Sequence, residues 1–285
     1  MATWNCLAVV GSGTMGSGIA YEIARNLHAR VIVCEVPEAL DRARSNLERL
    51  IERPLQKGQI TREQADEWSS RLSFTSDFAS LSQADAVIEA AFEDLNLKRD
   101  IFARLDTLCA PTALLATNTS GLSITRIAAA TNHPERVIGL HFFNPVPAMK
   151  LVEIVRAYQT SDETVARARE LCQDLKKETV LAKDYPGFIT TRIGMLMLAE
   201  AIRCLEEGVG TVEDIDLAMK LAFNHPMGPL ALADLVGLDV LLHILDDNRA
   251  ELGERFLASP LLRQMVAAGH LGQKTGRGFY DYARR

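Results

Sequence analysis

The chain has 285 residues, of which 48% are hydrophobic and 24% are charged, and its formal net charge is −6. This length accommodates one large or two medium domains, and the composition is normal for a soluble globular enzyme. The acidic balance argues against a broad nucleic-acid surface, although a local basic pocket for an anionic ligand stays possible. No apolar run reaches membrane-spanning length and no signal peptide is visible, so we expect no membrane partner.

The five cysteines are scattered along the chain and form no C-x-x-C pair. This spacing disfavours a disulfide framework and a zinc site, so we expect no bound metal. A reducing compartment is then the default, and we expect a cytoplasmic protein.

The start of the chain carries its most informative pattern. An apolar run leads into GSGTMG, then an alanine-rich amphipathic segment, a second apolar run and an acid, Glu35. This order predicts a strand, a phosphate-binding loop, a helix, a strand and a carboxylate that accepts hydrogen bonds from an adenosine ribose. Gly11 allows a tight turn, Gly13 lets the backbone approach a pyrophosphate, and Gly16 lets helix and strand pack closely. Thr14 and Met15 complete the loop at the helix N-terminus, which favours phosphate.

The same pattern selects NAD among the dinucleotides. Glu35 lies 19 residues after Gly16 (35 − 16) and would repel the 2′-phosphate of NADP, and Val36 and Pro37 offer no cation to bind one. FAD is disfavoured because the rest of the chain lacks an obvious second nucleotide fingerprint.

Strands and helices alternate up to about residue 183, which predicts a doubly wound, mainly parallel sheet of the Rossmann type. The Asp-Tyr-Pro-Gly sequence that starts at Asp184 breaks the pattern, and the chain after it looks wholly helical. We therefore expect an α/β domain over 1–183 and an all-helical domain over 184–285. The predicted strands are Leu7–Val10, Val31–Cys34, Leu72–Thr75, Ala86–Ala90, Leu114–Thr117, Val137–His141, Leu151–Val155 and Thr179–Leu181.

Several helix ends are also marked. Thr61 with Gln64 predicts a capping box. A long, buried helix is expected over Gly187–Glu206, a helix start at Thr211, and a helix that begins at Ser259-Pro260 and stops at Gly269.

Polar residues follow or interrupt three apolar strands. Asn118, Thr119 and Ser120 follow one, His141 ends the next before Asn144, and Glu153 lies within a third. Taken singly, the histidine could be structural, the glutamate could face solvent, and Ser120 could be a helix cap. Together they suit a dehydrogenase, because histidine, with an ordinary pKa of about 6.5, removes a hydroxyl proton and a carboxylate orients it. The alternative base, a tyrosine with lysine four residues on, is absent from the sequence.

The chain resembles the 3-hydroxyacyl-CoA dehydrogenases over nearly its whole length, and bacterial 3-hydroxybutyryl-CoA dehydrogenases in particular. The resemblance rests on GSGTMGSGIA, NTSGLSIT, GLHFFNPVPAMKLVEIV, PGFITTRI, NHPMGPLALADLVGLD and GRGFYDY. It implies reversible, NAD-dependent oxidation of an (S)-3-hydroxyacyl-CoA to the 3-oxoacyl-CoA, in fatty-acid or butanoate metabolism. It also implies a homodimer that associates through the C-terminal helices.

The resemblance assigns roles to particular residues. His141 would be the general base, Glu153 its orienting partner, and Ser120 a hydrogen-bond donor to the substrate oxygen near the nicotinamide. Further residues match positions that contact the cofactor, or in one case the CoA: Asn144, Glu93, Lys98 and, for the CoA, Lys57.

One departure from the family pattern concerns the active site. The family usually reads Gly-Phe, two apolar residues, then Asn-Arg, whereas this chain has Thr191 before Arg192. A hydroxyl offers one donor where a carboxamide offers two donors and a carbonyl acceptor. We expect Thr191 to keep a role in the substrate pocket.

Two other functions stay open. A dehydrogenase of a free 3-hydroxy acid, such as a sugar acid or a carnitine-like compound, would keep the NAD loop, His141 and Glu153 without a CoA groove. A non-catalytic NAD-binding protein is the second, and only Thr191 favours it.

Overall fold

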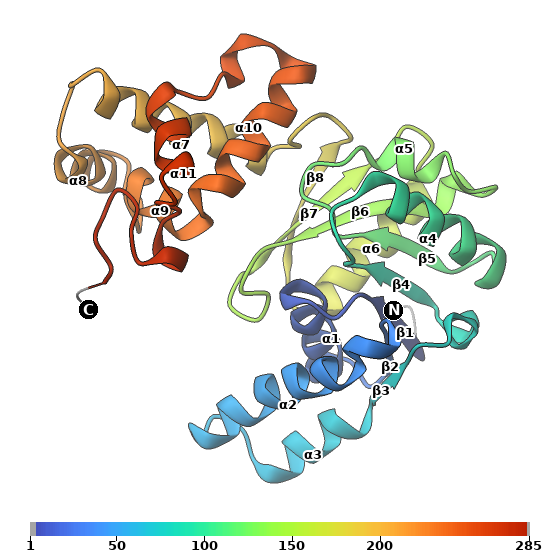
Figure 1. Cartoon of the computed structure of the whole chain (residues 1–285). Coiled ribbons are helices and arrows are strands. Elements are labelled where there is room, and N and C mark those ends of the chain that lie inside the picture. Colours follow the sequence, from blue (N-terminus) through green and yellow to red (C-terminus); the bar gives the residue numbers. More distant parts are fainter. Residues whose placement is uncertain (1–3, 284–285) are drawn as a thin grey trace. The chain divides into compact units, whose positions relative to one another are not determined.

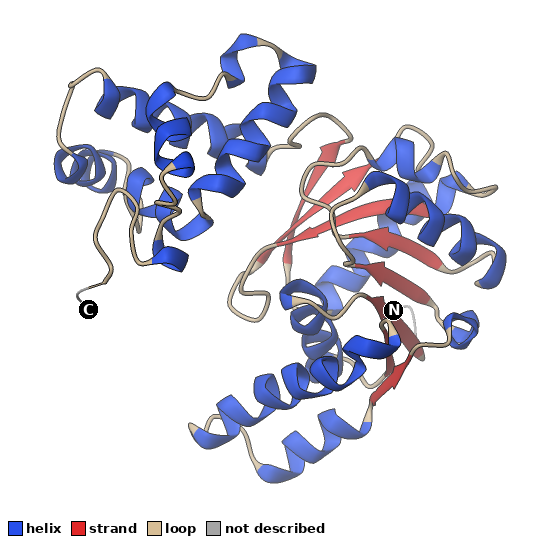
Figure 2. Cartoon of the chain, in the orientation of Figure 1, coloured by secondary structure: helices blue, strands red, loops and turns tan. Residues whose placement is uncertain are grey.

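The computed structural model describes residues 4–283, which form two compact units, one ending at Tyr185 and the other starting at Pro186 (Figure 1). The first unit is a sheet covered by helices, and the second contains helices without a sheet (Figure 2). This is the α/β fold with a helical C-terminal region that the sequence predicts.

The first unit is built on one eight-stranded sheet of order β3-β2-β1-β4-β5-β6-β7-β8. All neighbouring pairs from β3 to β6 are parallel, β6 and β7 are antiparallel, and β7 and β8 are parallel. The strands lie within a residue or two of the predicted positions: β1 (Cys6–Val10), β2 (Arg30–Cys34), β3 (Leu72–Thr75), β4 (Ala86–Glu89), β5 (Leu114–Thr117), β6 (Val137–Phe142), β7 (Leu151–Arg156) and β8 (Glu178–Lys183).

Most connections between these strands are helical, and four of the described helices, α3 to α6, are capped at their start by a side chain. Thr61 and Gln64 form the predicted capping box, and Asp94 and Ser161 accept hydrogen bonds from first-turn amides of their helices. The α-helices are α1 (Thr14–Asn26), α2 (Leu40–Gln56), α3 (Arg62–Ser70), α4 (Leu95–Leu108), α5 (Ile124–Ala128) and α6 (Asp162–Asp174). Short 3-10 helices lie at η1 (Pro37–Ala39), η2 (Phe78–Gln83) and η3 (Pro134–Arg136).

The two faces of the sheet differ in chemistry near the ends of the central strands. One face contributes Ile88, Ala116 and Leu140 to a core shared with α1 and α6. Because side chains alternate along a strand, the residues next to these point to the opposite face. That second face therefore carries four buried polar side chains: Glu89, Thr117, His141 and Glu153.

The second unit packs its helices around its own core, which includes Ile202, Leu230, Leu241 and Phe256. The predicted helix starts at Thr211 and Ser259 are confirmed, since both side chains accept an amide hydrogen bond. The elements are α7 (Thr190–Glu206), α8 (Val212–Ala222), α9 (Pro229–Val236), α10 (Leu238–Leu252), η4 (Glu254–Phe256), α11 (Pro260–Ala267) and η5 (Gln273–Thr275).

The start of α7 differs from the prediction. The helix begins at Thr190 and not at Gly187, because Gly187 and Phe188 have φ of +75° and +48° and cannot be part of a right-handed helix. The strained loop at the start of the second unit was not visible in the apolar pattern that predicted a longer helix.

Two buried acids of the second unit, Asp216 and Asp234, bind the C-terminal segment of the same unit, residues 279–282. Asp234 accepts hydrogen bonds from the amides of Phe279 and Tyr280 and from the hydroxyl of Tyr282. Asp216 accepts one from the Tyr280 hydroxyl at 2.9 Å. The sequence GRGFYDY thus supplies the donors that two buried carboxylates require.

In the described part of the chain, no helix is long and apolar enough to cross a membrane. The same residues contain no group of three histidine, cysteine or acidic side chains that could hold a metal ion.

Candidate active site

The glycine loop between β1 and α1 has the geometry that its three glycines predict. Gly11 has φ of +92°, and a Cβ there would lie 2.7 Å from the carbonyl oxygen of Ala90. A Cβ on Gly16 would lie 1.9 Å from the carbonyl oxygen of Gly11. A Cβ on Gly13 would meet no atom within 4 Å, so this glycine faces open space and not the protein. The first and third glycines are thus needed for packing, while Gly13 leaves room for an approaching ligand.

Helix α1 presents its N-terminus next to that space, and no acidic residue stands in its first turn. The amides of Thr14 and Met15 therefore belong to a turn with positive partial charge that suits phosphate. Glu35 lies beside the loop, where its Oε2 accepts hydrogen bonds from the amide and hydroxyl of Ser12, both at 2.8 Å. The Oε1 atom accepts one from the Val36 amide at 2.9 Å and has a further lone pair for a hydroxyl donor. These residues fit the dinucleotide that the sequence predicts.

His141 and Glu153 face one another across the only antiparallel pair of the described sheet. They are directly paired in the β6–β7 register, and His141 Nδ1 lies 3.1 Å from Glu153 Oε2. Glu153 is fully buried and His141 is 7% exposed, with the Phe143 ring 4.4 Å from the imidazole centroid. When Glu153 is ionised, its carboxylate can only accept, so Nδ1 then carries the proton and Nε2 is the basic ring nitrogen.

Sequence spacing alone contained a sign of this hairpin. Residues 143–150, which join the two strands, are too few for a parallel crossover, which needs a dozen or more. Asn144 lies in this connection, before a cis peptide bond to Pro145. The buried Lys177 ammonium donates to the carbonyl oxygens of Val146 and Met149 and pairs with Glu22 at 2.9 Å. The connection that carries Asn144 is therefore tied to α1 and to the residue that precedes β8.

Ser120 follows β5 and is held by Glu93. One carboxylate oxygen of Glu93 accepts from the Ser120 amide at 3.0 Å, from its hydroxyl at 3.4 Å and from the Thr119 hydroxyl. The other oxygen lies 3.4 Å from the ammonium of Lys98. The family resemblance predicted both Glu93 and Lys98 near the cofactor, and the structure adds that Lys98 is only 1% exposed and contacts the Glu93 carboxylate.

Two residues in this region escaped the sequence analysis. Glu89 is fully buried at the end of β4, where it binds Lys98, and Thr117 at the end of β5 donates to it. Glu89 could have been identified from the sequence, because it is a carboxylate at the end of the apolar run that forms β4. Asn118, in contrast, accepts from the Phe142 amide at 2.9 Å and ties the ends of β5 and β6 together.

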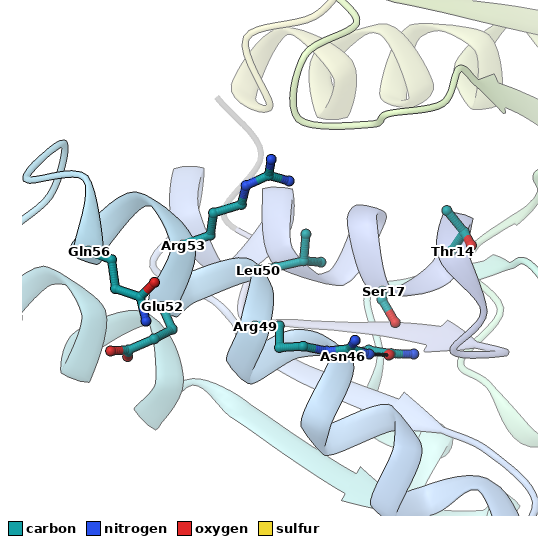
Figure 3. Close-up of a pocket in the computed structure, with 8 residues that line it drawn as sticks. All are labelled: Thr14, Ser17, Asn46, Arg49, Leu50, Glu52, Arg53 and Gln56. Atoms are coloured by element: carbon teal, nitrogen blue, oxygen red, sulfur yellow. Dashed lines mark hydrogen bonds between the residues drawn. The ribbon is translucent and has the colours of Figure 1, made fainter. Parts of the chain in front are cut away.

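A pocket of about 510 Å³ lies between α1 and α2 (Figure 3). Figure 3 shows Asn46 and Arg49 on α2 near Ser17 of α1, while the Arg53 guanidinium extends away from them. The lining residues are Thr14, Ser17, Asn46, Arg49, Leu50, Glu52, Arg53 and Gln56. Thr14 belongs to the glycine loop, so the pocket adjoins the proposed pyrophosphate site. Lys57, at the C-terminal end of α2, is exposed and follows the last lining residue.

Thr191 belongs to the second unit, where it lies in the first turn of α7 and is 8% exposed. The other predicted site residues all belong to the first unit.

The fold and the glycine loop together define a dinucleotide-binding oxidoreductase. Residues 6–185 match the family model described as 3-hydroxyacyl-CoA dehydrogenase, NAD binding domain, and residues 187–282 match the C-terminal domain of the same enzymes. The chain therefore belongs to the 3-hydroxyacyl-CoA dehydrogenase family. The predicted family, the NAD cofactor and the assignment as an enzyme are confirmed.

Relatives of known description are similar over almost their full length. The chain is 46% identical to a 3-hydroxybutyryl-CoA dehydrogenase of Clostridioides difficile, over 97% of this chain and 99% of the relative. It is 45% identical to a probable 3-hydroxybutyryl-CoA dehydrogenase of Bacillus subtilis, over 98% of both chains. The crystal structure of (S)-3-hydroxybutyryl-CoA dehydrogenase PaaH1 from Ralstonia eutropha superposes with a TM-score of 0.93 at 40% identity and covers 98% of this chain and 99% of that one.

Proposed function

We propose that the protein catalyses the reversible, NAD-dependent oxidation of a short (S)-3-hydroxyacyl-CoA, 3-hydroxybutyryl-CoA in the first place, to the 3-oxoacyl-CoA. The buried pair of His141 and Glu153 at the carboxyl edge of the sheet, in the same unit as the glycine loop, carries this proposal. Relatives described as 3-hydroxybutyryl-CoA dehydrogenases, at 45–46% identity, support the acyl group.

His141 is the general base in this mechanism. Its Nε2 takes the proton from the 3-hydroxyl group while the C3–H bond breaks and a carbonyl forms. NAD, held by the glycine loop and Glu35, would supply the acceptor for the hydride that leaves C3. Glu153, at 3.1 Å from Nδ1, holds the required tautomer and stabilises the imidazolium that forms. In the reducing direction the imidazolium returns the proton to the oxygen of the substrate.

Ser120 donates a hydrogen bond to the reacting oxygen, and Asn144 lies in the same unit on the connection that follows His141. Glu35 binds the adenosine ribose, and Gly11, Gly13, Thr14, Met15 and Gly16 form the pyrophosphate loop, with Glu93 and Lys98 nearer the nicotinamide.

Helix α2 supports the choice of a CoA thioester over a free hydroxy acid. Arg49, Arg53 and Lys57 are exposed and recur every four residues, so they lie along one side of the helix. The first two line the pocket beside the glycine loop, and Lys57 continues the row to the helix end. Such a row of cations suits the phosphates of coenzyme A, which a free acid lacks.

We propose further that Thr191 keeps a role in substrate binding and that the second unit forms a homodimer. Exposed apolar side chains support the dimer: Leu217 and Leu221, one turn apart on α8, are 48% and 77% exposed, and Phe223 is 68% exposed. All five cysteines are free thiols, which suits the reducing cytoplasm.

Oxidation of NADH with acetoacetyl-CoA tests the proposal. The native chain is compared with His141→Ala, with NADPH in place of NADH, and with free acetoacetate in place of the thioester. Fast turnover of NADH and thioester that the substitution abolishes is the expected result. Turnover of free acids alone would refute the CoA assignment, and NADH binding without turnover of either would refute the proposed reaction.

A further inference from the structure

A buried ion pair lies beneath the candidate active site and takes no direct part in the proposed mechanism. The Lys98 ammonium donates to Glu89 Oε1 at 2.7 Å, and the two side chains are 1% and 0% exposed. Glu89 is satisfied on all sides, since it also accepts from the Thr117 hydroxyl at 2.7 Å and from the Ala91 amide at 2.7 Å. Removing two charges from water is costly, so a buried ion pair is weak evidence for a contribution to stability, and a positioning role is the alternative.

The Glu89–Lys98 pair contacts a third charged side chain, Glu93. The Lys98 ammonium lies 3.4 Å from Glu93 Oε2, while Glu93 Oε1 accepts from the Ser120 amide and hydroxyl. A continuous chain of charge-assisted contacts thus runs from the end of β4 to Ser120. Two carboxylates share one ammonium, so without Lys98 the two negative charges would have no cation between them.

We propose that Glu89 and Lys98 are positioning residues that fix the Glu93 carboxylate, and through it the amide and hydroxyl of Ser120, for the proposed reaction. Glu89 sets the direction of the ammonium because Thr117 and Ala91 fix both of its oxygens. The ammonium then keeps the Glu93 carboxylate turned toward residues 118–123, the loop that carries Ser120 (the Ser120 loop). This inference rests on the proposed function only for its effect on turnover. The ordering of the loop can be measured without any substrate.

A second buried pair provides the matched control. Asp106 binds Arg136 at 2.9 Å and is 1% exposed in its side chain, and Arg136 is 7% exposed. This pair joins the C-terminal turn of α4 to the residue before β6, so it lies at the opposite edge of the sheet from Ser120. It shares the burial and the charge of the Glu89–Lys98 pair without a contact to Glu93.

The experiment compares Lys98→Met, the double variant Glu89→Gln/Lys98→Met and the control Asp106→Asn. Amide hydrogen exchange of residues 118–123 reports the order of the Ser120 loop, and thermal unfolding reports stability. Steady-state kinetics with NADH and acetoacetyl-CoA report kcat and KM. The double variant leaves no unpaired buried charge, so we expect it to fold even if Lys98→Met alone does not.

We expect faster exchange at Ser120 in both Lys98 variants and a kcat lower by on the order of 100-fold, the cost of misplacing a reacting contact, with little change in KM. Asp106→Asn is expected to lower the unfolding temperature while it leaves exchange at Ser120 and kcat unchanged. A native rate of amide exchange at Ser120 in the double variant would overturn the inference. A double variant in which both kcat and the unfolding temperature return to the native values would also overturn it. A native chain without turnover would refute the proposed function, and the exchange result would still decide the positioning role.

Discussion

The contact between His141 and Glu153 leads to the sharpest prediction about catalysis. Glu153→Gln keeps the shape of the side chain but removes its charge, and the amide can accept from Nδ1–H or donate to a bare Nδ1. The second arrangement places the proton on Nε2, where the proposed mechanism needs a base. The substitution therefore weakens catalysis in two ways, by permitting the wrong tautomer and by removing the anion that faces the imidazolium.

The geometry sets the size of the effect. Two unit charges separated by the observed 3.1 Å attract each other by about 5 kcal/mol at an effective dielectric constant of about 20. Both side chains are buried, at 8% and 0% exposure, so solvent screening is slight. Since about 1.36 kcal/mol is a factor of ten in rate, kcat is expected to fall by about 10³- to 10⁴-fold.

Stopped-flow or steady-state oxidation of NADH with acetoacetyl-CoA measures this loss. Glu178→Gln is the matched control, because Glu178 is exposed on the neighbouring strand β8 and should leave kcat unchanged. NADH affinity should be native in both variants. If Glu153→Gln retains more than a tenth of the native kcat, the carboxylate does not stabilise the imidazolium and the reasoning from its burial is wrong.

Three further predictions concern the loop and the helical unit. Gly16→Ala should prevent stable folding of the loop, because its Cβ would lie 1.9 Å from a carbonyl oxygen. Gly13→Ala should keep the native unfolding temperature but weaken NADH binding, because its Cβ would enter the open space beside the loop. Equal NADH affinity in Gly13→Ala and the native chain, measured by fluorescence titration, would contradict the prediction for Gly13. Phe256→Ala should destabilise the second unit by about 3–5 kcal/mol, since removal of this fully buried side chain leaves a cavity. Urea unfolding measures the change, and a decrease in unfolding free energy of less than about 1 kcal/mol would contradict the prediction. Burial, the Asp234 charge and the hydrogen bond to it raise the pKa of Tyr282 to about 12. Because this folded pKa exceeds the ordinary value of about 10, the stability from the Tyr282 hydroxyl is complete below pH 10 and is lost as the pH rises toward 12. The gap in unfolding free energy between the native chain and Tyr282→Phe should therefore close over that range, and a gap independent of pH would refute the assignment.

The amino-acid sequence by itself determined the elements and the cofactor loop. Local signals were sufficient there: three glycines at fixed spacing, an acid after the second strand, and caps such as Thr61 and Ser259 act over a few residues. The strands were visible because buried parallel strands are continuous apolar runs. The apolar pattern failed at the start of α7, since the positive φ of Phe188 depends on the surrounding loop and not on hydropathy.

The family resemblance predicted that Glu153 orients His141, but only the tertiary structure decided the geometry by which the polar side chains meet. His141 and Glu153 are opposite each other because β7 runs antiparallel to β6, and strand direction is set by pairing across the sheet. Glu89, Lys98 and Glu93 come from a strand, a helix and a loop, and their contacts arise only when α4 packs on the sheet face that carries Thr117. Burial then makes these pairings obligatory, because a charge withdrawn from water must find a partner that the linear sequence does not specify.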